Sequence, residues 1–353
     1  MSALRPPLRI LVRAPSWLGD FVACEPVLRA LHARHAAAGL AQRLTIVAPA
    51  PFLELVRARL AGARLVAAAR GTAPDPRAWA GHDSALLLDG SARSAWCALR
   101  AGIGCRIGWS GGGRGPLLTL GATPARERGA TPLGLGVHGR WPRRLPRPFA
   151  SACAELAGLG GLEVRERTPC LEPDPAATAR ARARLAERGL EPDAPFLLVN
   201  AGGRPHSAKA AEPAALAARA RAAGMAVVLV CGPGEERHAR ATCELLAGVR
   251  ALLLDDPPPT LAELVALSGL SSACLTADSG PRHVAQALGK PVTVLCGPTD
   301  PRHTAEHAAN VTVLRAEVPC GPCHREVCPL RGEEQRACMR LLALDRNANP
   351  DRG

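Results

Sequence analysis

The residues best suited to chemistry lie where a short apolar run gives way to a polar turn late in the chain. Residues 273–276 predict a buried strand, and the turn Asp278-Ser279-Gly280 follows it. These residue types favour a turn and a helix cap. Pro281 suits the first turn of a helix, and apolar residues at helical spacing come after it. The sequence therefore predicts a strand, a turn and a helix in succession.

A strand–turn–helix junction of this kind is suited to binding phosphate. Backbone N–H groups at the start of the helix point outward, and the positive end of the helix dipole adds to their attraction for an anion. Ser279 can add a hydroxyl donor, and His283 lies one turn into the helix. The alternative is an ordinary capped junction without a ligand, so the rest of the chain must decide.

Two further polar turns follow predicted strands. The first, after residues 196–199, contains Gly202 and Gly203, whose small size lets backbone approach a phosphate, and Lys209, which supplies a cation. Two adjacent glycines are a weak signal, but Lys209 is one of only two lysines among the 353 residues. The other turn contains Glu235, which either accepts hydrogen bonds from ribose hydroxyls or belongs to a solvated helix start.

An acid follows the first predicted strand. Residues 8–13 form that strand, and Gly19-Asp20 precede a helix predicted over residues 21–35. In an open α/β sheet the carboxyl end of a strand points to the ligand crevice, so the glycine leaves room for a substrate that Asp20 would face. Asp20 is therefore a candidate general base. The alternative is that Asp20 only favours the helix N-terminus electrostatically.

Strands and helices alternate along the chain in two series. This alternation is typical of parallel, doubly wound sheets, and its restart predicts an α/β protein with two Rossmann-like domains, 1–170 and 171–340. Two such domains facing each other would create an interdomain cleft, a favoured place for ligands. The predicted strands are 8–13, 44–48, 64–68, 85–88, 196–199, 226–230, 251–254, 273–276 and 292–296, and the predicted helices are 21–35, 51–60, 92–101, 150–156, 173–190, 212–223, 234–247 and 260–268.

The composition excludes several classes of protein. Apolar residues make up 47% of the chain and charged residues 21%, which indicates a globular protein rather than a disordered one. No uninterrupted apolar run approaches the length of a membrane span, and the N-terminal sequence lacks the features of a signal peptide. We therefore expect a cytoplasmic protein whose 13 cysteines are mostly reduced thiols.

The net charge of +13 is carried almost wholly by arginine, and part of it is concentrated in one insertion. Residues 111–148 hold seven arginines and one acid, show no periodicity and are rich in Gly and Pro. Such a stretch suits a phosphate-bearing partner such as nucleic acid, anionic lipid or a phosphorylated glycan. Few aromatic residues are present to stack on bases, which disfavours nucleic acid. The candidate contacts are Arg114, Arg140, Arg143 and Arg144.

Four cysteines lie close together near the C-terminus. Cys320, Cys323, Cys328 and Cys338 are separated by two, four and nine residues. Four thiols in a reducing compartment resemble a closed, structural metal site, such as one for zinc. The spacing is irregular for a zinc ribbon, so neutral buried thiols and a conditional disulfide are the alternatives.

Two distant motifs resemble those of a known family. One is Arg13-Ala-Pro-Ser-Trp-Leu-Gly-Asp20, and the other is Asp278-Ser-Gly-Pro-Arg-His283 with the Gly-Lys-Pro segment that follows. The strand and helix at 86–96 and the segment 106–109 also fit. Together they resemble the family-nine glycosyltransferases, the ADP-heptose:lipopolysaccharide heptosyltransferases. The opening and the Cys-rich tail, 320–338, are most similar to the heptosyltransferase II branch of that family.

The resemblance implies a GT-B fold, in which two Rossmann-like domains face a cleft and the second binds most of the donor nucleotide. It implies that Asp20 is the catalytic base and that Lys209 contacts the donor diphosphate. The phosphate-holding turn would be Ser279 and Gly280, supported by Asp278 and His283. The chain departs from the family's usual pattern at Ala210-Ala211-Glu212, at Pro281-Arg282 and in the Arg-rich insertion.

The activity implied by the resemblance is inverting transfer of a heptose from ADP-heptose to the phosphorylated lipid A–core of lipopolysaccharide. No cofactor would be required, and the enzyme would work as a peripheral protein on the inner face of the cytoplasmic membrane. One alternative is a GT-B transferase that uses another nucleotide-sugar, or a nucleotide-sugar epimerase. The non-enzymatic alternative is a basic protein that binds nucleic acid or membrane.

Overall fold

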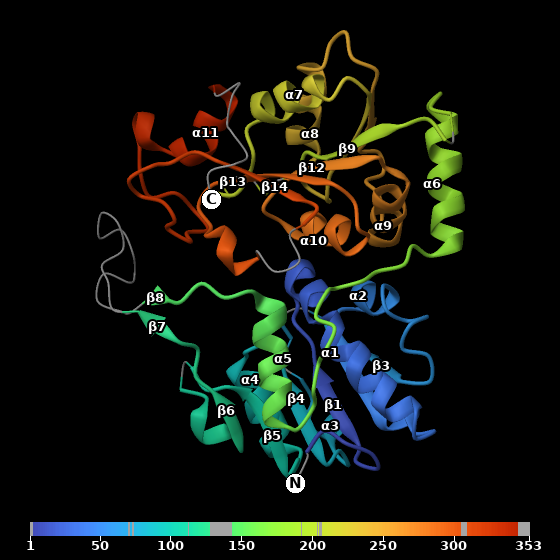
Figure 1. Cartoon of the computed structure of the whole chain (residues 1–353), viewed down its shortest axis with the longest axis vertical. Helices are drawn as coiled ribbons and strands as arrows, with labels where there is room; N and C mark the ends of the chain where they lie inside the picture. The colour runs from blue at the N-terminus through green and yellow to red at the C-terminus, as the bar shows by residue number, and fades with distance from the viewer. Residues whose placement is uncertain are drawn as a thin grey trace. The chain divides into compact units, whose positions relative to one another are not determined.

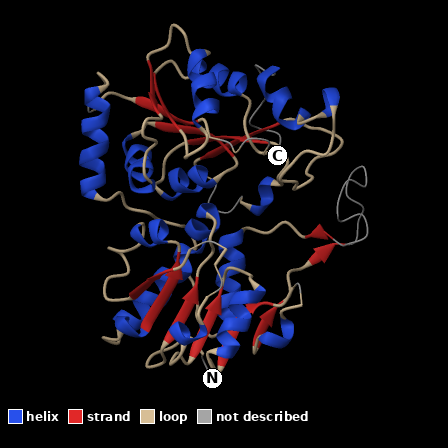
Figure 2. Ribbon diagram, turned by 180° about the vertical axis from the view of Figure 1, so that it is seen from behind, coloured by secondary structure: helices blue, strands red, loops and turns tan. Residues whose placement is uncertain are grey.

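The computed structural model divides into two compact units, which are described separately (Figures 1 and 2). Unit 1 comprises residues 1–126 and 144–171, and unit 2 comprises residues 127–143 and 172–353. The residues that the structure describes are 3–69, 71–72, 74–111, 113–127, 143–191, 193–202, 204, 207–304 and 309–344.

Unit 1 contains a six-stranded parallel sheet in the order β3-β2-β1-β4-β5-β6. Strand β1 is buried along its whole length, as expected for a central strand that is covered on both faces. The strands are β1 (Ile10–Arg13), β2 (Leu44–Ala48), β3 (Arg64–Ala67), β4 (Ser84–Leu87), β5 (Cys105–Trp109) and β6 (Leu120–Ala122), and the helices are α1 (Leu18–Ala36), α2 (Ala50–Glu54), α3 (Pro76–Trp79), α4 (Ala92–Arg100) and α5 (Phe149–Leu159).

Unit 2 repeats this topology with a parallel sheet in the order β11-β10-β9-β12-β13-β14. Figure 2 shows helices around the strands in both units. The strands are β9 (Phe196–Asn200), β10 (Ala226–Val230), β11 (Ala251–Leu254), β12 (Ala273–Ala277), β13 (Val292–Cys296) and β14 (Val311–Arg315), and the helices are α6 (Pro175–Glu187), α7 (Pro213–Ala222), α8 (Glu236–Glu244), α9 (Leu261–Leu270), α10 (Gly280–Ala287) and α11 (Ala337–Leu344).

Each sheet has one point where the direction of the strand order reverses. In unit 1 it lies between β1 and β4, and in unit 2 between β9 and β12. Open α/β sheets bind their ligands beyond the carboxyl ends of the strands at this point. The predicted α/β class with two Rossmann-like sheets is confirmed, and the sheets identify where each unit is expected to act.

Residues 111–148 show no periodicity, which predicts an insertion without regular structure, but the described part of the insertion contains short strands. Strand β6 pairs with β5 and completes the sheet of unit 1. A short two-stranded sheet is formed by β7 (Arg126–Glu127) and β8 (Arg143–Arg144). These strands have two or three residues each, too few to produce a periodic pattern. Residues 128–142 lie outside the described residues.

The predicted helix over 51–60 is too long, because α2 ends at Glu54. The chain continues in turns, one of which is closed by a hydrogen bond of 2.9 Å from Leu60 N–H to the Val56 carbonyl. Leu53, Val56 and Leu60 are nevertheless all buried, so a helix and these turns share one apolar pattern. Of the helices among the described residues, none combines the length and apolar character needed to cross a bilayer.

Candidate functional site

The loops at the switch point of unit 2 carry most of the predicted phosphate site. Strands β10, β9 and β12 are neighbours in the sheet. Because they are parallel, the loops at their carboxyl ends lie along one edge. Gly202 follows β9, Glu235 follows β10, and Asp278 and Ser279 follow β12. The fold therefore places on one edge residues that are more than 70 positions apart in the chain.

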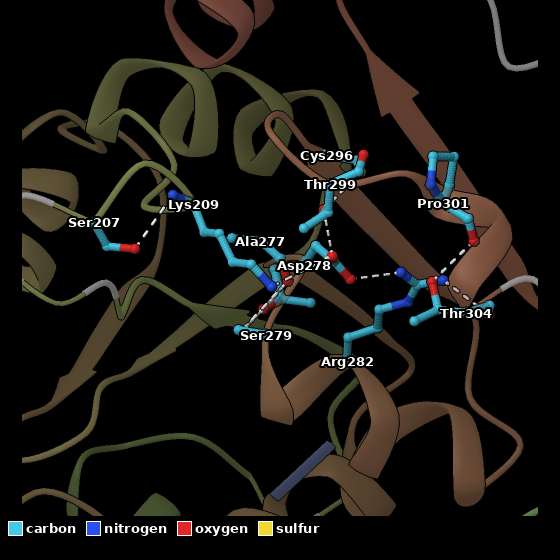
Figure 3. A network of polar contacts seen from close by, with 11 residues as sticks. Ser207, Lys209, Ala277, Asp278, Ser279, Arg282, Cys296, Thr299, Pro301 and Thr304 are labelled. Atoms are coloured by element: carbon cyan, nitrogen blue, oxygen red, sulfur yellow. Dashed lines mark hydrogen bonds and ion pairs between the residues drawn. The ribbon is translucent and has the colours of Figure 1, made fainter. Parts of the chain in front are cut away.

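Asp278 is the centre of a charged network at this edge (Figure 3). Arg282 Nη1 donates to Asp278 Oδ1 at 2.7 Å, and Thr299 Oγ1 donates to Asp278 Oδ2 at 2.6 Å. Lys209 Nζ lies 3.9 Å from Asp278 Oδ2, an ion pair at greater than hydrogen-bond distance. In the view of Figure 3, Lys209 and Arg282 approach the carboxylate from opposite sides.

These contacts keep Asp278 ionised. Burial alone would raise the pKa of the carboxyl, but Arg282, Lys209 and the Thr299 hydroxyl outweigh it and hold the pKa of Asp278 below its ordinary value. The Lys209 side chain is 45% exposed, whereas the Arg282 side chain is fully buried. Lys209 is therefore the cation of this network that an anion from solvent can reach.

Helix α10 begins beside the network, with Ser279 as its N-cap residue. Among the described contacts, the Ser279 hydroxyl caps no backbone N–H of the helix. It lies 3.4 Å from both Thr276 Oγ1 and the Ala277 carbonyl oxygen. Pro281 lacks an N–H group, so this helix start has one donor fewer than the same turn without proline. The predicted turn and helix are present, with Gly280 at the first helical position. Binding of phosphate by this turn stays a prediction.

His283 is neutral in this setting. Burial, together with the neighbouring Arg282, lowers its pKa to about 4. An uncharged imidazole adds no positive charge to the helix start at neutral pH. Any attraction for an anion at this site therefore comes from Lys209, Arg282 and the helix rather than from His283.

Gly202 packs closely against Glu235. A Cβ at this position would overlap the Glu235 carboxylate and lie 2.9 Å from Asn200 Oδ1. Glu235 Oε2 accepts a hydrogen bond of 2.9 Å from Gly232 N–H, and Gly202 N–H donates to Asn200 Oδ1 at 3.0 Å. Glu235 is thus held at the same edge by the backbone. Gly203 lies outside the described residues.

Asp20 lies at the corresponding edge of unit 1, in the first turn of α1 and beyond the carboxyl end of β1. Its side chain is partly exposed. This is the position that the sequence predicts for it, at the switch point between β1 and β4. Its role as a general base stays a prediction.

The edge of unit 1 holds a second carboxylate, which was not predicted from the sequence. Asp89 follows β4, and its Oδ2 lies 3.5 Å from Arg13 Nε at the end of β1. Ser94 Oγ donates to the same oxygen at 2.5 Å, and Arg13 Nη2 donates to Ser16 Oγ at 3.0 Å. Burial raises the pKa of Asp89, because the Ser94 hydroxyl and Arg13 do not fully offset it. The sequence feature that could have identified Asp89 is an acid directly after an apolar strand.

The basic insertion is only partly described. Arg114 Nε donates to the Trp109 carbonyl oxygen at 3.0 Å, which ties the start of the insertion to β5. Arg143 and Arg144 form β8, and their side chains lie outside the described residues, as does all of Arg140. Contact of these arginines with an acceptor stays a prediction.

The described residues contain no group of three or more His, Cys, Asp or Glu side chains that could hold a metal ion. The structure therefore does not show the predicted metal site of Cys320, Cys323, Cys328 and Cys338. Cys338 is buried on α11 against Gly297, and Cys328 Sγ accepts a hydrogen bond of 3.3 Å from Arg336 N–H. Burial and the three other thiols raise the pKa of Cys338 to about 11, so Cys338 is a protonated, packed thiol at neutral pH.

The Cys-rich tail instead supports the loop that carries Lys209. Ala208 N–H donates to the Glu326 carbonyl oxygen at 2.7 Å. Arg336 forms a hydrogen bond with the Ala210 carbonyl and an ion pair of 3.3 Å with Glu212. The tail is thereby joined to the lysine loop on both sides of Lys209.

The two Rossmann-like units define a protein of the GT-B class, and similar solved structures have the same fold. A family 9 glycosyl transferase from Veillonella parvula superposes with a TM-score of 0.70, at 19% identity over 88% of this chain and 86% of that one. ADP-heptose lipopolysaccharide heptosyltransferase II of Escherichia coli superposes with a TM-score of 0.60, at 21% identity over 96% of this chain and 99% of that one. The GT-B prediction is thereby confirmed.

Comparison of the sequence with known proteins gives two matches, and both are to heptosyltransferases. Residues 161–333 match the model of glycosyltransferase family 9 (heptosyltransferase). Lipopolysaccharide heptosyltransferase 1 of Pseudomonas aeruginosa is 32% identical over 121 residues, which are 34% of this chain and 33% of that protein. The match thus spans about a third of the relative's length. Residues 161–333 thus match the model of the family that the motifs predict.

Proposed function

We propose that this protein is an inverting glycosyltransferase that moves a heptose from ADP-heptose to the inner core of lipopolysaccharide. The observation that carries the proposal is the network of Lys209, Asp278 and Arg282 beside the start of α10. It combines one exposed cation, a second cation behind it and a helix N-terminus at the switch point of a parallel sheet. That combination suits the diphosphate of a nucleotide-sugar.

The departing diphosphate would be stabilised by unit 2. As the bond between the anomeric carbon and the phosphate oxygen breaks, negative charge develops on the ADP leaving group, and positive charge develops on the sugar. Lys209 and the backbone at Gly280 would stabilise the negative charge without a metal ion. Glu235, held by Gly232 at the same edge, would accept hydrogen bonds from ribose hydroxyls.

The acceptor would be activated by unit 1. Asp20 would take the proton of the acceptor hydroxyl as its oxygen forms the new bond to the anomeric carbon, on the face opposite the leaving ADP. A single displacement of this kind inverts the anomeric centre. The partial exposure of Asp20 at the carboxyl edge of the sheet supports this role.

The identity of the substrates is inferred from the relatives. The similar Escherichia coli structure is named as an ADP-heptose enzyme and the Pseudomonas aeruginosa relative as a lipopolysaccharide heptosyltransferase. We assign the acceptor side to residues 1–170 and the donor side to residues 171–340. Arginines of the 111–148 insertion would meet the phosphates of the lipid A–core acceptor, and the protein would work in the cytoplasm at the inner leaflet.

The test is a panel of donors offered with a heptose-deficient lipopolysaccharide core. We expect mass spectrometry to show heptose transfer from ADP-heptose, undiminished by a chelator, and no transfer from a GDP-sugar or a UDP-sugar. Transfer from a different donor would replace the heptose assignment, and interconversion of free nucleotide-sugars would indicate an epimerase. Steeply salt-dependent nucleic-acid binding without affinity for any nucleotide-sugar would reject the enzymatic proposal. Metal analysis of the same sample tests the structural zinc prediction.

A further inference from the structure

Arg282 is a buried cation in a part of the network that no solvent ion can reach directly. It is the third residue of α10, and its side chain has no exposed surface. A buried guanidinium is costly unless it is paired. The filling of space therefore does not explain why a buried arginine pairs with Asp278 at this position.

Packing alone does not account for an arginine at this position. Arg282 Nη1 binds Asp278, and Nη2 donates to the Thr304 carbonyl oxygen at 3.3 Å. Its Nε is buried without a hydrogen-bond partner among the described residues. An unpaired buried donor destabilises the folded state, whereas a methionine of similar length would fill the same volume without that penalty.

The geometry instead shows how Arg282 affects Lys209. Asp278 carries one negative charge between two cations, and Arg282 is the nearer, at 2.7 Å against 3.9 Å for Lys209. With Thr299 on the other carboxylate oxygen, each oxygen of Asp278 already accepts a hydrogen bond without Lys209. The three side chains together carry a net charge of about +1 at neutral pH. Without Arg282 the net charge would be zero, and Asp278 would draw Lys209 inward.

We propose that Arg282 is a positioning residue that neutralises Asp278 and thereby leaves the Lys209 ammonium for the diphosphate of the donor. This inference rests on the proposed function and deepens it, because it assigns donor affinity in part to a side chain that does not touch the donor.

The experiment compares the wild type, Arg282→Met and the double variant Asp278→Asn/Arg282→Met by calorimetric titration with ADP and with inorganic pyrophosphate. Arg282→Met should bind both ligands about tenfold more weakly, because Lys209 pairs with Asp278. The double variant removes the anion as well, so Lys209 is released and affinity should return to within about threefold of the wild type. The affinity for adenosine, which lacks phosphate, should be the same in all three proteins.

The outcomes separate this inference from the proposed function. Unchanged ADP affinity in folded Arg282→Met would overturn the inference and leave the proposed function standing. The same holds if the double variant binds as weakly as the single one, because release of Lys209 requires that affinity return once the Asp278 charge is removed. If circular dichroism shows that Arg282→Met is unfolded, the double variant decides: wild-type affinity supports the inference and lost affinity overturns it. A wild type that binds pyrophosphate but not ADP refutes the ADP-sugar proposal only, and one that binds neither refutes both.

Discussion

The switch points of the two units have the same topology but hold their carboxylates differently. In each unit an aspartate follows the fourth strand of the Rossmann-like series and pairs with an arginine. In unit 2, Arg282 approaches Asp278 to 2.7 Å from the following helix. In unit 1, Arg13 approaches Asp89 only to 3.5 Å from the neighbouring strand.

The difference appears in the opposite pKa shifts of the two carboxyls. The pKa of Asp278 is held below its ordinary value because two cations and a hydroxyl outweigh burial, whereas burial prevails and raises the pKa of Asp89. One fold thus provides a fixed charge pattern in unit 2 and a carboxyl that accepts protons more readily in unit 1. The charge around the two carboxylates therefore differs although the topology is the same.

The largest expected effect separates chemistry from donor binding. Asp20→Asn should lower kcat for heptose transfer by roughly 10²–10⁴-fold, because an amide cannot accept the acceptor's proton. The ADP affinity should stay unchanged, because the donor is assigned to unit 2. Transfer assays measure kcat, and calorimetry on the same preparation measures the ADP affinity.

Asp89→Asn is the matched control for this prediction, since Asp89 is the other carboxylate identified at that edge. It should reduce kcat much less than Asp20→Asn. If instead Asp89→Asn abolishes transfer and Asp20→Asn does not, the assignment of the base to Asp20 is wrong and Asp89 takes its place.

The next effect concerns stability. Asp278→Asn removes the partner of a buried guanidinium and should lower the free energy of unfolding by about 3–5 kcal/mol. Asp89→Asn should cost about 1–2 kcal/mol, because Arg13 keeps its hydrogen bonds to Ser16 and to the Val47 carbonyl oxygen. Urea denaturation of both variants measures the loss in the free energy of unfolding. Equal losses would mean that the Arg282–Asp278 and Arg13–Asp89 pairs contribute equally to stability, despite their different distances.

The sequence predicted the sheets well where apolar runs are bounded by turn residues. The bounds of β2, β10, β11 and β13 match the prediction residue for residue. Strand β14 was missed because it lies at the edge of its sheet, with alternating partial exposure rather than a continuous apolar run. Helix α11 was missed because it begins at the end of the Cys-rich tail, where the spacing of the thiols dominated the pattern.

The site was only partly predictable, because local sequence does not determine which distant side chains meet. Local turn chemistry identified Asp278, Ser279 and Lys209 as candidates, because each follows a strand. It could not show that Thr299 binds Asp278 from 21 residues away, or that Arg282 turns inward. Side-chain direction at a loop or a helix start depends on the tertiary fold. The same limit explains why the Arg13–Asp89 pair was missed.

The smallest expected effect depends on pH. The pKa of His283 is about 4 in the folded protein and about 6.5 when unfolded, so the unfolded chain binds more protons between these values. Stability from this group is therefore complete above pH 6.5 and is lost as the pH falls toward 4. His283→Gln should flatten the dependence of the urea midpoint on pH over that range. Parallel curves for variant and wild type would show that His283 is not held neutral.

The central claim is that the edge of unit 2 holds a diphosphate through Lys209, and calorimetric titration of ADP tests it most directly. Lys209→Ala should weaken binding about 10–100-fold, while Lys290→Ala, which removes the chain's other lysine, should bind as the wild type does. Adenosine should bind all three proteins alike. Equal ADP affinity in the wild type and Lys209→Ala would contradict the account.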